Sequence, residues 1–131
     1  MGNEPRTMRV RGSVPEAISR LHQLLADRGI EVLASIDHAA GARGAGLELA
    51  DEVVVFFGNP AIGTGVMRDD PRAGIDLPLR ILFWDDKGTT YLAYRDPQEL
   101  AEVFDLVDGR DVPAKPSEFM TTLASDLRAE R

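Results

Sequence analysis

The side chain best suited to acid–base chemistry in this sequence is His38, which lies in the segment IDHAAGA. Histidine titrates near neutral pH, and His38 directly follows Asp37 just beyond an expected strand. Asp37 could orient the imidazole only if the chain has already turned there, because neighbouring strand residues point to opposite faces. His38 is therefore a candidate general acid or base, and the structural alternative is that it caps the AAGA turn.

A second candidate site lies in VVVFFGNPAIGTGVM, residues 53–67, where an apolar run enters a glycine-rich segment. Gly58 and Gly63 have the spacing of a P-loop, but Thr64 and a glycine stand where its Lys and Ser or Thr belong. The third glycine of a dinucleotide-binding loop is also missing. Both nucleotide motifs therefore fail. Backbone N–H groups, the Asn59 amide and the Thr64 hydroxyl could still form a polar site at the strand end, and the simpler alternative is a turn that folding needs.

A third candidate is Asp76, in GIDLPLRILFW. It precedes Leu77-Pro78 at the start of an expected strand, and antiparallel pairing would bring it to the same end of the sheet as the glycine-rich segment. The alternative is that Asp76 caps a turn and that Pro78 only protects the start of the strand.

The residue types argue against metal and covalent chemistry. Zinc usually takes three or four nitrogen, sulfur or carboxylate ligands, and the chain has two His and no Cys. No Ser lies in a Gly-x-Ser-x-Gly elbow. The acidic pairs Asp69-Asp70 and Asp85-Asp86 are adjacent residues in expected turns, which usually face water. We expect no metal and no cofactor, and the sequence leaves open whether the protein is an enzyme.

The composition indicates one globular domain over residues 1–131, with 44% hydrophobic and 28% charged residues. A net charge of −7 without a basic cluster argues against nucleic acid and anionic membranes as partners. The absence of Cys agrees with a reducing compartment, and the first residues, MGNEPRTMRVRG, lack the apolar core of a signal peptide. We therefore expect a cytoplasmic protein.

The first half of the chain predicts a short strand at residues 7–11, then a helix, then further strands. Ser13 is an expected N-cap with Glu16 three residues later, and Gly29 is an expected C-terminal cap. The helix should bury Ile18, Leu21, Leu24 and Leu25. Residues 30–36 read as a strand, DHAAGARGAG as a short helix or turn, and residues 53–57 as a strand near the middle of the sheet.

The second half predicts a hairpin and two helices. LRILFWDDKGTTYLAY contains two strands joined by a tight turn at Lys87-Gly88. Asp96 is the expected N-cap of a helix that buries Leu100, Val103, Phe104 and Val107. Asp108-Gly109 should end it, DVPAKP is a linker, and a last helix over about residues 116–130 should bury Phe119, Met120, Leu123 and Leu127. This order predicts a two-layer α/β sandwich of the α+β kind, with about five strands, a helix after strand 1 and two C-terminal helices.

Four ordered motifs, IDHAAGA, FFGNPAIGTGVM, GIDLPLRILFWDD and YLAYRDP, resemble the bacterial family catalogued as domain of unknown function 302. The resemblance covers roughly residues 8–108 and implies a mixed sheet, a homodimer and no established activity. Matching signature positions are Asp37, His38, Gly58, Asn59, Pro60, Gly63, Thr64, Met67, Leu77, Pro78 and Tyr94. Arg95 stands where the family often has Asn.

These observations favour a homodimeric module that binds a small ligand or a partner. The expected site is a polar pocket near GNPAIGTG, built from His38, Asn59, Thr64, Asp76 and Tyr94 with Gly58 and Gly63. The first alternative is a small enzyme that uses His38 as acid or base while loop N–H groups, Asn59 or Thr64 stabilise an anion. The second alternative is a purely structural dimer.

Overall fold

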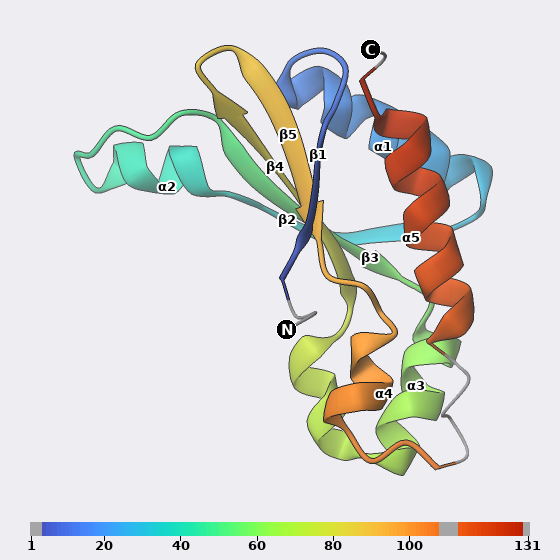
Figure 1. The fold of residues 1–131 in the computed structure, drawn as a ribbon. Coiled ribbons are helices and arrows are strands. Elements are labelled where there is room, and N and C mark those ends of the chain that lie inside the picture. The colour runs from blue at the N-terminus through green and yellow to red at the C-terminus, as the bar shows by residue number, and fades with distance from the viewer. Residues whose placement is uncertain (1–3, 108–112, 130–131) are drawn as a thin grey trace.

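The computed structural model describes residues 4–107 and 113–129, and Figure 1 shows how they are arranged. One sheet has the strand order β1-β5-β4-β3-β2. Its strands are β1 (Arg6–Arg9), β2 (Glu31–Asp37), β3 (Glu52–Gly58), β4 (Leu79–Asp86) and β5 (Thr89–Tyr94). The helices are α1 (Val14–Asp27), α2 (His38–Gly44), α3 (Pro60–Asp69), α4 (Glu99–Val103) and α5 (Ala114–Leu127), with the 3₁₀ helix η1 (Pro71–Asp76). The predicted α+β sandwich is confirmed.

All four pairs of neighbouring strands are antiparallel, so the mixed sheet implied by the family resemblance is wrong. β1 and β2 run in the same direction, but the connection through α1 places them at opposite edges of the sheet. Three strands separate them, so this crossover creates no parallel pair between neighbours.

Helices α1 and α5 pack against one face of the sheet (Figure 1). The core between them contains Val55 and Phe57 of β3, Ile81 and Phe83 of β4, and Leu92 of β5, all fully buried. The predicted capping box of α1 is present, because Ser13 Oγ accepts from the Glu16 N–H and Glu16 Oε1 accepts from the Ser13 N–H.

The hairpin between β4 and β5 forms at the predicted turn. Lys87 and Gly88 have φ of 53° and 92°, and two central residues with positive φ are typical of a type I′ turn. Asp85 Oδ1 also accepts from the Gly88 N–H at 3.1 Å. The turn twists with the strands and sets their register.

Below the sheet, α3, η1, α4 and the residues up to Leu106 form a small helical lobe (Figure 1). Its own apolar cluster contains Val66, Ala73, Leu100 and Leu106. The predicted buried side of the helix after Asp96 is only partly correct, because Val103 and Val107 are 57% and 78% exposed. α4 has only five residues, and the chain is already extended at Phe104. The helical spacing that predicted burial of Val107 therefore does not reach that residue.

Helix α5 begins at Ala114 and ends at Leu127, and its inward residues are largely those predicted. Met120, Leu123 and Leu127 are buried, and Phe119 is half-buried. The expected break at Asp108-Gly109 and the first residues of the linker lie outside the described residues. After α5, Arg128 forms an isolated antiparallel bridge with Val10, and the Ala129 N–H donates to the Arg9 carbonyl at 2.9 Å.

Asp96 joins three parts of the fold at the end of β5. Its carboxylate accepts from Ser117 Oγ of α5 at 2.6 Å, the Gln98 N–H at 3.0 Å and the Arg6 guanidinium of β1 at 2.8 Å. Burial raises the pKa of Asp96, but these hydrogen bonds outweigh burial and leave the pKa below its usual value. The ionised carboxylate is therefore the form that holds β1, α4 and α5 together.

Asp70 fixes the helical lobe. The Arg72 side chain donates to its buried carboxylate at 2.8 Å, and the N–H groups of Asp105 and Arg72 donate at 3.1 Å and 3.0 Å. The Arg72 side chain first, and the Asp105 N–H next, hold the pKa of Asp70 well below its usual range. A single ionised side chain therefore ties the start of η1 to a segment 35 residues later.

Replacing Asp96 by Ala should lower the free energy of unfolding by about 2 kcal/mol, because hydrogen bonds to a charged group are lost and Ser117 keeps an unpaired hydroxyl. Arg6→Ala is the comparison. Arg6 is 58% exposed, so its loss should cost less than about 1 kcal/mol. Urea unfolding at pH 7 measures both, and equal losses would contradict the central role of the bonds to Ser117 and the backbone.

Replacing Asp70 by Asn should lower the urea midpoint at pH 7. Because the folded-state pKa of Asp70 is depressed, its contribution is complete above the unfolded pKa of about 4 and is lost as pH falls below that value. The difference between wild type and Asp70→Asn should therefore be equal at pH 7 and pH 5 and shrink below pH 4. Asp105→Asn is the control, since its side chain is 91% exposed and its N–H is kept. A difference that does not depend on pH would refute this account.

Candidate functional site

The segment GNPAIGTG forms the start of helix α3, not a glycine loop. Asn59 is the N-cap in an extended conformation, and Pro60 occupies the first helical turn. An Asn N-cap followed by Pro is a strong helix start. Gly63 and Gly65 lie inside the helix, where each costs about 1 kcal/mol relative to Ala. The start signal therefore outweighs two glycines that suggested a loop.

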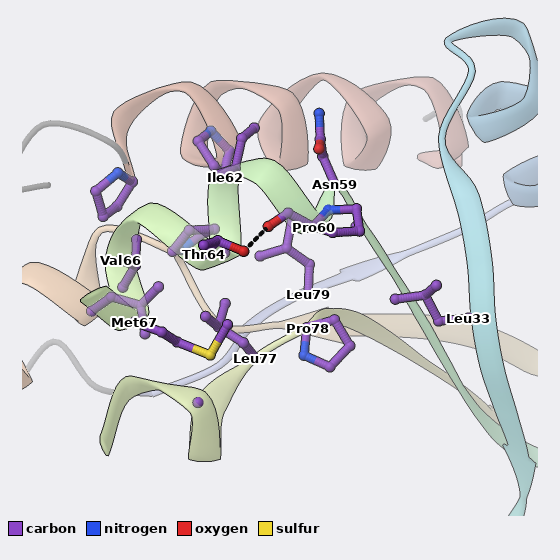
Figure 2. Close-up of a pocket in the computed structure, with 17 residues that line it drawn as sticks. Leu33, Asn59, Pro60, Ile62, Thr64, Val66, Met67, Leu77, Pro78 and Leu79 are labelled. Carbon is purple, nitrogen blue, oxygen red and sulfur yellow. Dashed lines mark hydrogen bonds between the residues drawn. The ribbon is translucent and has the colours of Figure 1, made fainter. Parts of the chain in front are cut away.

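The N–H groups that could have held an anion are already bonded to Asn59. Its side-chain oxygen accepts from the Ala61 N–H at 2.9 Å, and its carbonyl accepts from the Ile62 and Gly63 N–H groups at 3.1 Å and 3.3 Å. The Thr64 hydroxyl donates to the Pro60 carbonyl at 2.7 Å (Figure 2). The first turn of α3 is therefore closed, and it offers no cradle for a phosphate or an oxyanion.

A cavity of about 310 Å³ lies beside α3, where the helical lobe meets the start of β4 and the start of α5. Seven of its lining residues have large apolar side chains, drawn with the rest of the lining in Figure 2: Leu33, Ile62, Val66, Met67, Leu77, Leu79 and Leu100. Five prolines complete much of the rest: Pro60, Pro78, Pro97, Pro113 and Pro116. The proline ring has little conformational freedom, so this part of the pocket lining is rigid.

The lining is apolar, so the predicted polar character of the pocket is wrong. Asn59 and Thr64 are the two polar side chains among the described lining residues, and none of these residues carries a charge. Both are bonded within α3, which lowers their capacity to hold a polar ligand. The surface that remains suits hydrocarbon or aromatic groups.

The structure brings four of the seven predicted site residues to this pocket: Gly58, Asn59, Gly63 and Thr64. The other three, His38, Asp76 and Tyr94, do not line it. Asp76 is exposed at the end of η1, and Tyr94 is buried in the core that the sheet forms with α1 and α5. The expected convergence at one end of the sheet does not occur, because η1 carries Asp76 away before β4 begins.

His38 is the first residue of α2 and is exposed. Figure 1 shows α2 projecting from the sheet away from α3. Asp37 does not orient the imidazole. It is the N-cap of α2, and its Oδ1 accepts from the Ala40 N–H at 2.9 Å. Among the described residues, no three His, Cys, Asp or Glu side chains are placed to hold a metal ion.

Sequence reasoning missed Leu33 and the prolines. The pairing of β2 with β3 shifts register between Val32 and Ala34, and Leu33 at this bulge lines the pocket. Bulges commonly redirect a side chain in this way. Alternating apolar residues predicted only a strand, since nothing local marks which residue is bulged. The usable signal was the presence of eight prolines, two of which lie in DVPAKP, the segment expected to be only a linker.

Gly63 keeps part of the cavity open. A Cβ built at this position would lie 3.7 Å from Leu77 Cδ1 and 3.8 Å from Met67 Cε, which is ordinary van der Waals contact. A Cβ at Gly65, two residues further along α3, would meet nothing within 4 Å, and Gly65 does not line the pocket. The two helix positions therefore differ in whether a side chain would occupy the cavity.

Comparison with known proteins gives both a family and a fold. Residues 6–127 match the family described as Domain of unknown function DUF302. The structure is similar to the crystal structure of uncharacterized conserved protein DUF302 from Bacillus stearothermophilus, with a TM-score of 0.83 and 21% sequence identity. The similarity covers 95% of this chain and 98% of that one.

The sequence is also similar to part of two longer curated proteins. It is 40% identical over 110 residues to Fluoride-specific ion channel FluC 1 of Brucella suis biovar 1 and to the protein of the same name from Brucella abortus biovar 1. The match covers 83% of this chain but 43% and 41% of those relatives, so the chain spans about two fifths of their length. In the described part of this chain, no helix is both long and apolar enough to cross a membrane. The family match confirms the resemblance seen in the motifs, and the chain belongs to the family Domain of unknown function DUF302.

Proposed function

We propose that this protein is a binding module whose pocket takes a small, uncharged and largely apolar molecule. The observation that carries the proposal is the cavity of about 310 Å³ beside α3, with its apolar lining. This volume lies at the lower end of the range of about 300–1,000 Å³ that is typical of small-molecule sites. A ligand here would exchange water for contacts with leucine, methionine and proline side chains.

The lining argues for an uncharged ligand. A charged group in an apolar cavity loses its hydration and needs a partner of opposite charge. The described lining residues provide none, and the N–H groups of the first turn of α3 are already bonded. The Thr64 oxygen can still accept one hydrogen bond, so a ligand with a single polar group at its edge fits.

The arrangement favours binding over the two alternatives. Acid–base catalysis at this pocket would need a titratable group within hydrogen-bonding reach of the ligand, and His38 lies on α2 instead. A purely structural role would leave the apolar lining in contact with water, which is unfavourable. A bound molecule would remove that apolar surface from water.

We also propose that the module works as a homodimer. Helices α1 and α5 cover one face of the sheet, and several large apolar side chains, including Leu47 and Leu49, stay exposed in the described chain. A second copy could cover such surface.

The pocket is tested with the uncharged fluorescent probe N-phenyl-1-naphthylamine. Wild-type protein should bind it saturably, and Gly63→Leu should weaken binding at least about tenfold, because the new side chain occupies the cavity. Gly65→Leu is the matched control, since it makes the same change in the same helix outside the pocket and should leave binding within about twofold. Equal affinities of the two variants, or no saturable binding by the wild type, would overturn the proposal.

A second proposal follows from the similarity to part of the Brucella channel proteins. We propose that this chain acts together with a fluoride channel and carries the ligand-binding function, because 110 residues of those proteins are 40% identical to it. Its own pocket does not suit fluoride, since a bare anion needs donors or cations that the described lining lacks.

The channel association can be tested in a chimera. The matching segment of the Brucella suis protein is replaced by this chain, and fluoride efflux from intact cells is measured. We expect efflux to be retained and to change when the chimera carries Gly63→Leu but not Gly65→Leu. If efflux is the same whether the segment is intact, mutated or deleted, a role with the channel is refuted. The proposal that the pocket binds a small ligand would not be affected by that result.

A further inference from the structure

Strand β2 is an open edge of the sheet. It pairs with β3 along one side, and in the described part of the chain no strand pairs along its other side. Its residues from Leu33 to Asp37 are all exposed, with Leu33 at 47% and Ile36 at 48%. Alternate residues of an edge strand direct their N–H and C=O groups away from the sheet. β2 therefore offers a row of backbone donors and acceptors beside exposed apolar side chains.

β2 lacks most of the features that protect an edge from pairing. Natural edge strands are often very short, carry Lys or Pro, or are covered by another element. β2 has seven residues, and those between Glu31 and Asp37 include no charge and no Pro. Its bulge lies between Val32 and Ala34, so residues 34–37 keep regular pairing with β3. The other edge strand, β1, has only four residues and is joined by the chain end.

The charged residues of β2 lie at its two ends, and both are acidic: Glu31 and Asp37. Asp37 is paired with Val53, which follows two further acids, Asp51 and Glu52. Both ends of the strand are therefore negatively charged, while its middle is neutral and largely apolar.

The nearest basic residues along the chain do not pair with these acids. Arg28 lies 5.7 Å from the centre of the Phe119 ring and 3.9 Å from Asp126, both on α5. Arg43 is exposed in the last turn of α2. Within the described chain, neither end of β2 takes part in an ion pair. The acids of β2 can therefore pair with basic groups of a partner.

We infer that β2 binds an extended peptide segment of another protein, which adds a strand to the sheet. The segment has uncharged residues that favour β-structure in its middle and a basic residue near each end. Backbone hydrogen bonds supply the affinity, and contacts with Ile36 and with the two acids supply the specificity. The inference goes beyond the pocket ligand proposed above and does not depend on it, since Leu33 is the only residue of β2 that lines the pocket.

The sequence of β2 disfavours a second copy of this chain as the occupant. When the whole strand pairs with itself in antiparallel register, Glu31 of one copy lies opposite Asp37 of the other, at both ends. Like charges that lie directly opposite each other destabilise a strand pair. A segment with basic ends is instead stabilised by the same two acids.

The first test uses a fluorescein-labelled peptide, Lys-Val-Thr-Val-Thr-Val-Lys, which matches β2 in length. Fluorescence anisotropy should show saturable binding to the wild-type protein. The same peptide with Glu in place of both Lys should bind at least about tenfold more weakly, because its acids would face Glu31 and Asp37. Absence of saturable binding would overturn the inference, and equal affinities of the two peptides would overturn the requirement for basic ends.

N-methylated peptides test whether binding occurs by strand addition. An extended peptide directs the N–H groups of alternate residues to opposite edges, so only one set can face β2. Two further peptides carry N-methyl groups on every Val or on every Thr. One should lose affinity at least about tenfold, and the other should stay within about threefold of the unmodified peptide. Equal effects of the two sets would contradict strand addition, because binding through side chains alone does not distinguish the two edges.

Protein variants locate the site. Ile36→Lys places a charge among the apolar side chains of β2 and should weaken peptide binding at least about tenfold. Ile75→Lys makes the same change at a residue that is 78% exposed on η1, and it should leave the affinity within about twofold. Circular dichroism checks folding, and Ser35→Lys is the second variant if Ile36→Lys does not fold. Equal peptide affinities of the β2 and η1 variants would place the peptide elsewhere and overturn the inference.

Two further measurements separate this inference from the earlier proposals. Ile36 does not line the pocket, so Ile36→Lys should bind N-phenyl-1-naphthylamine as the wild type does. Peptide binding without probe binding would overturn the pocket ligand and keep this inference, and probe binding without peptide binding would do the reverse. If the wild type binds no peptide and sedimentation equilibrium shows a dimer that Ile36→Lys dissociates, a second copy occupies β2 and the peptide is overturned as its partner.

Discussion

The turn from β3 into α3 at Asn59 and Pro60 is the constraint on which the lower half of the molecule depends. β3 is an interior strand, and its last residue, Gly58, is followed at once by a capped helix. Because the Asn59 side chain and carbonyl take three N–H groups of α3, the helix leaves the sheet in a fixed direction. That direction places Val66 in the apolar cluster of the lobe and leaves a cavity between the lobe and the sheet.

The same turn explains why the pocket is apolar. The N–H groups that could have bound a ligand donate to Asn59 at the start of α3 instead. The pocket is lined by side chains of the helical lobe and the sheet that face each other. Outside the pocket, Asp70 ties the start of η1 to the backbone at Asp105, and Asp96 ties the end of β5 to α5. Hydrogen bonds and ion pairs therefore hold the surrounding elements in place, and apolar side chains line the pocket between them.

Local signals in the sequence predicted much of this fold. Ser13 with Glu16, and Lys87 with Gly88, determine a helix start and a tight turn through neighbours only, and both were predicted correctly. The same approach failed for GNPAIGTG, because two glycines suggested a loop while Asn59-Pro60 started a helix. The pocket itself could not be predicted, since it joins Leu33, Leu77 and Pro116, which are far apart in the chain. Such contacts depend on strand order and on a bulge, and neither leaves a local pattern.

The short pairing of the chain end with β1 limits how the sheet can grow. Arg128 and Ala129 occupy backbone groups at one end of a strand that has only four residues. This leaves β2, with seven residues and a bulge at Leu33, as the one long edge in the described chain. Open-ended stacking of sheets into a fibre needs a usable edge on both sides of each copy. A strand added at β1 would have to displace the contacts of Arg128 and Ala129, so β2 is the more accessible edge for pairing with another strand.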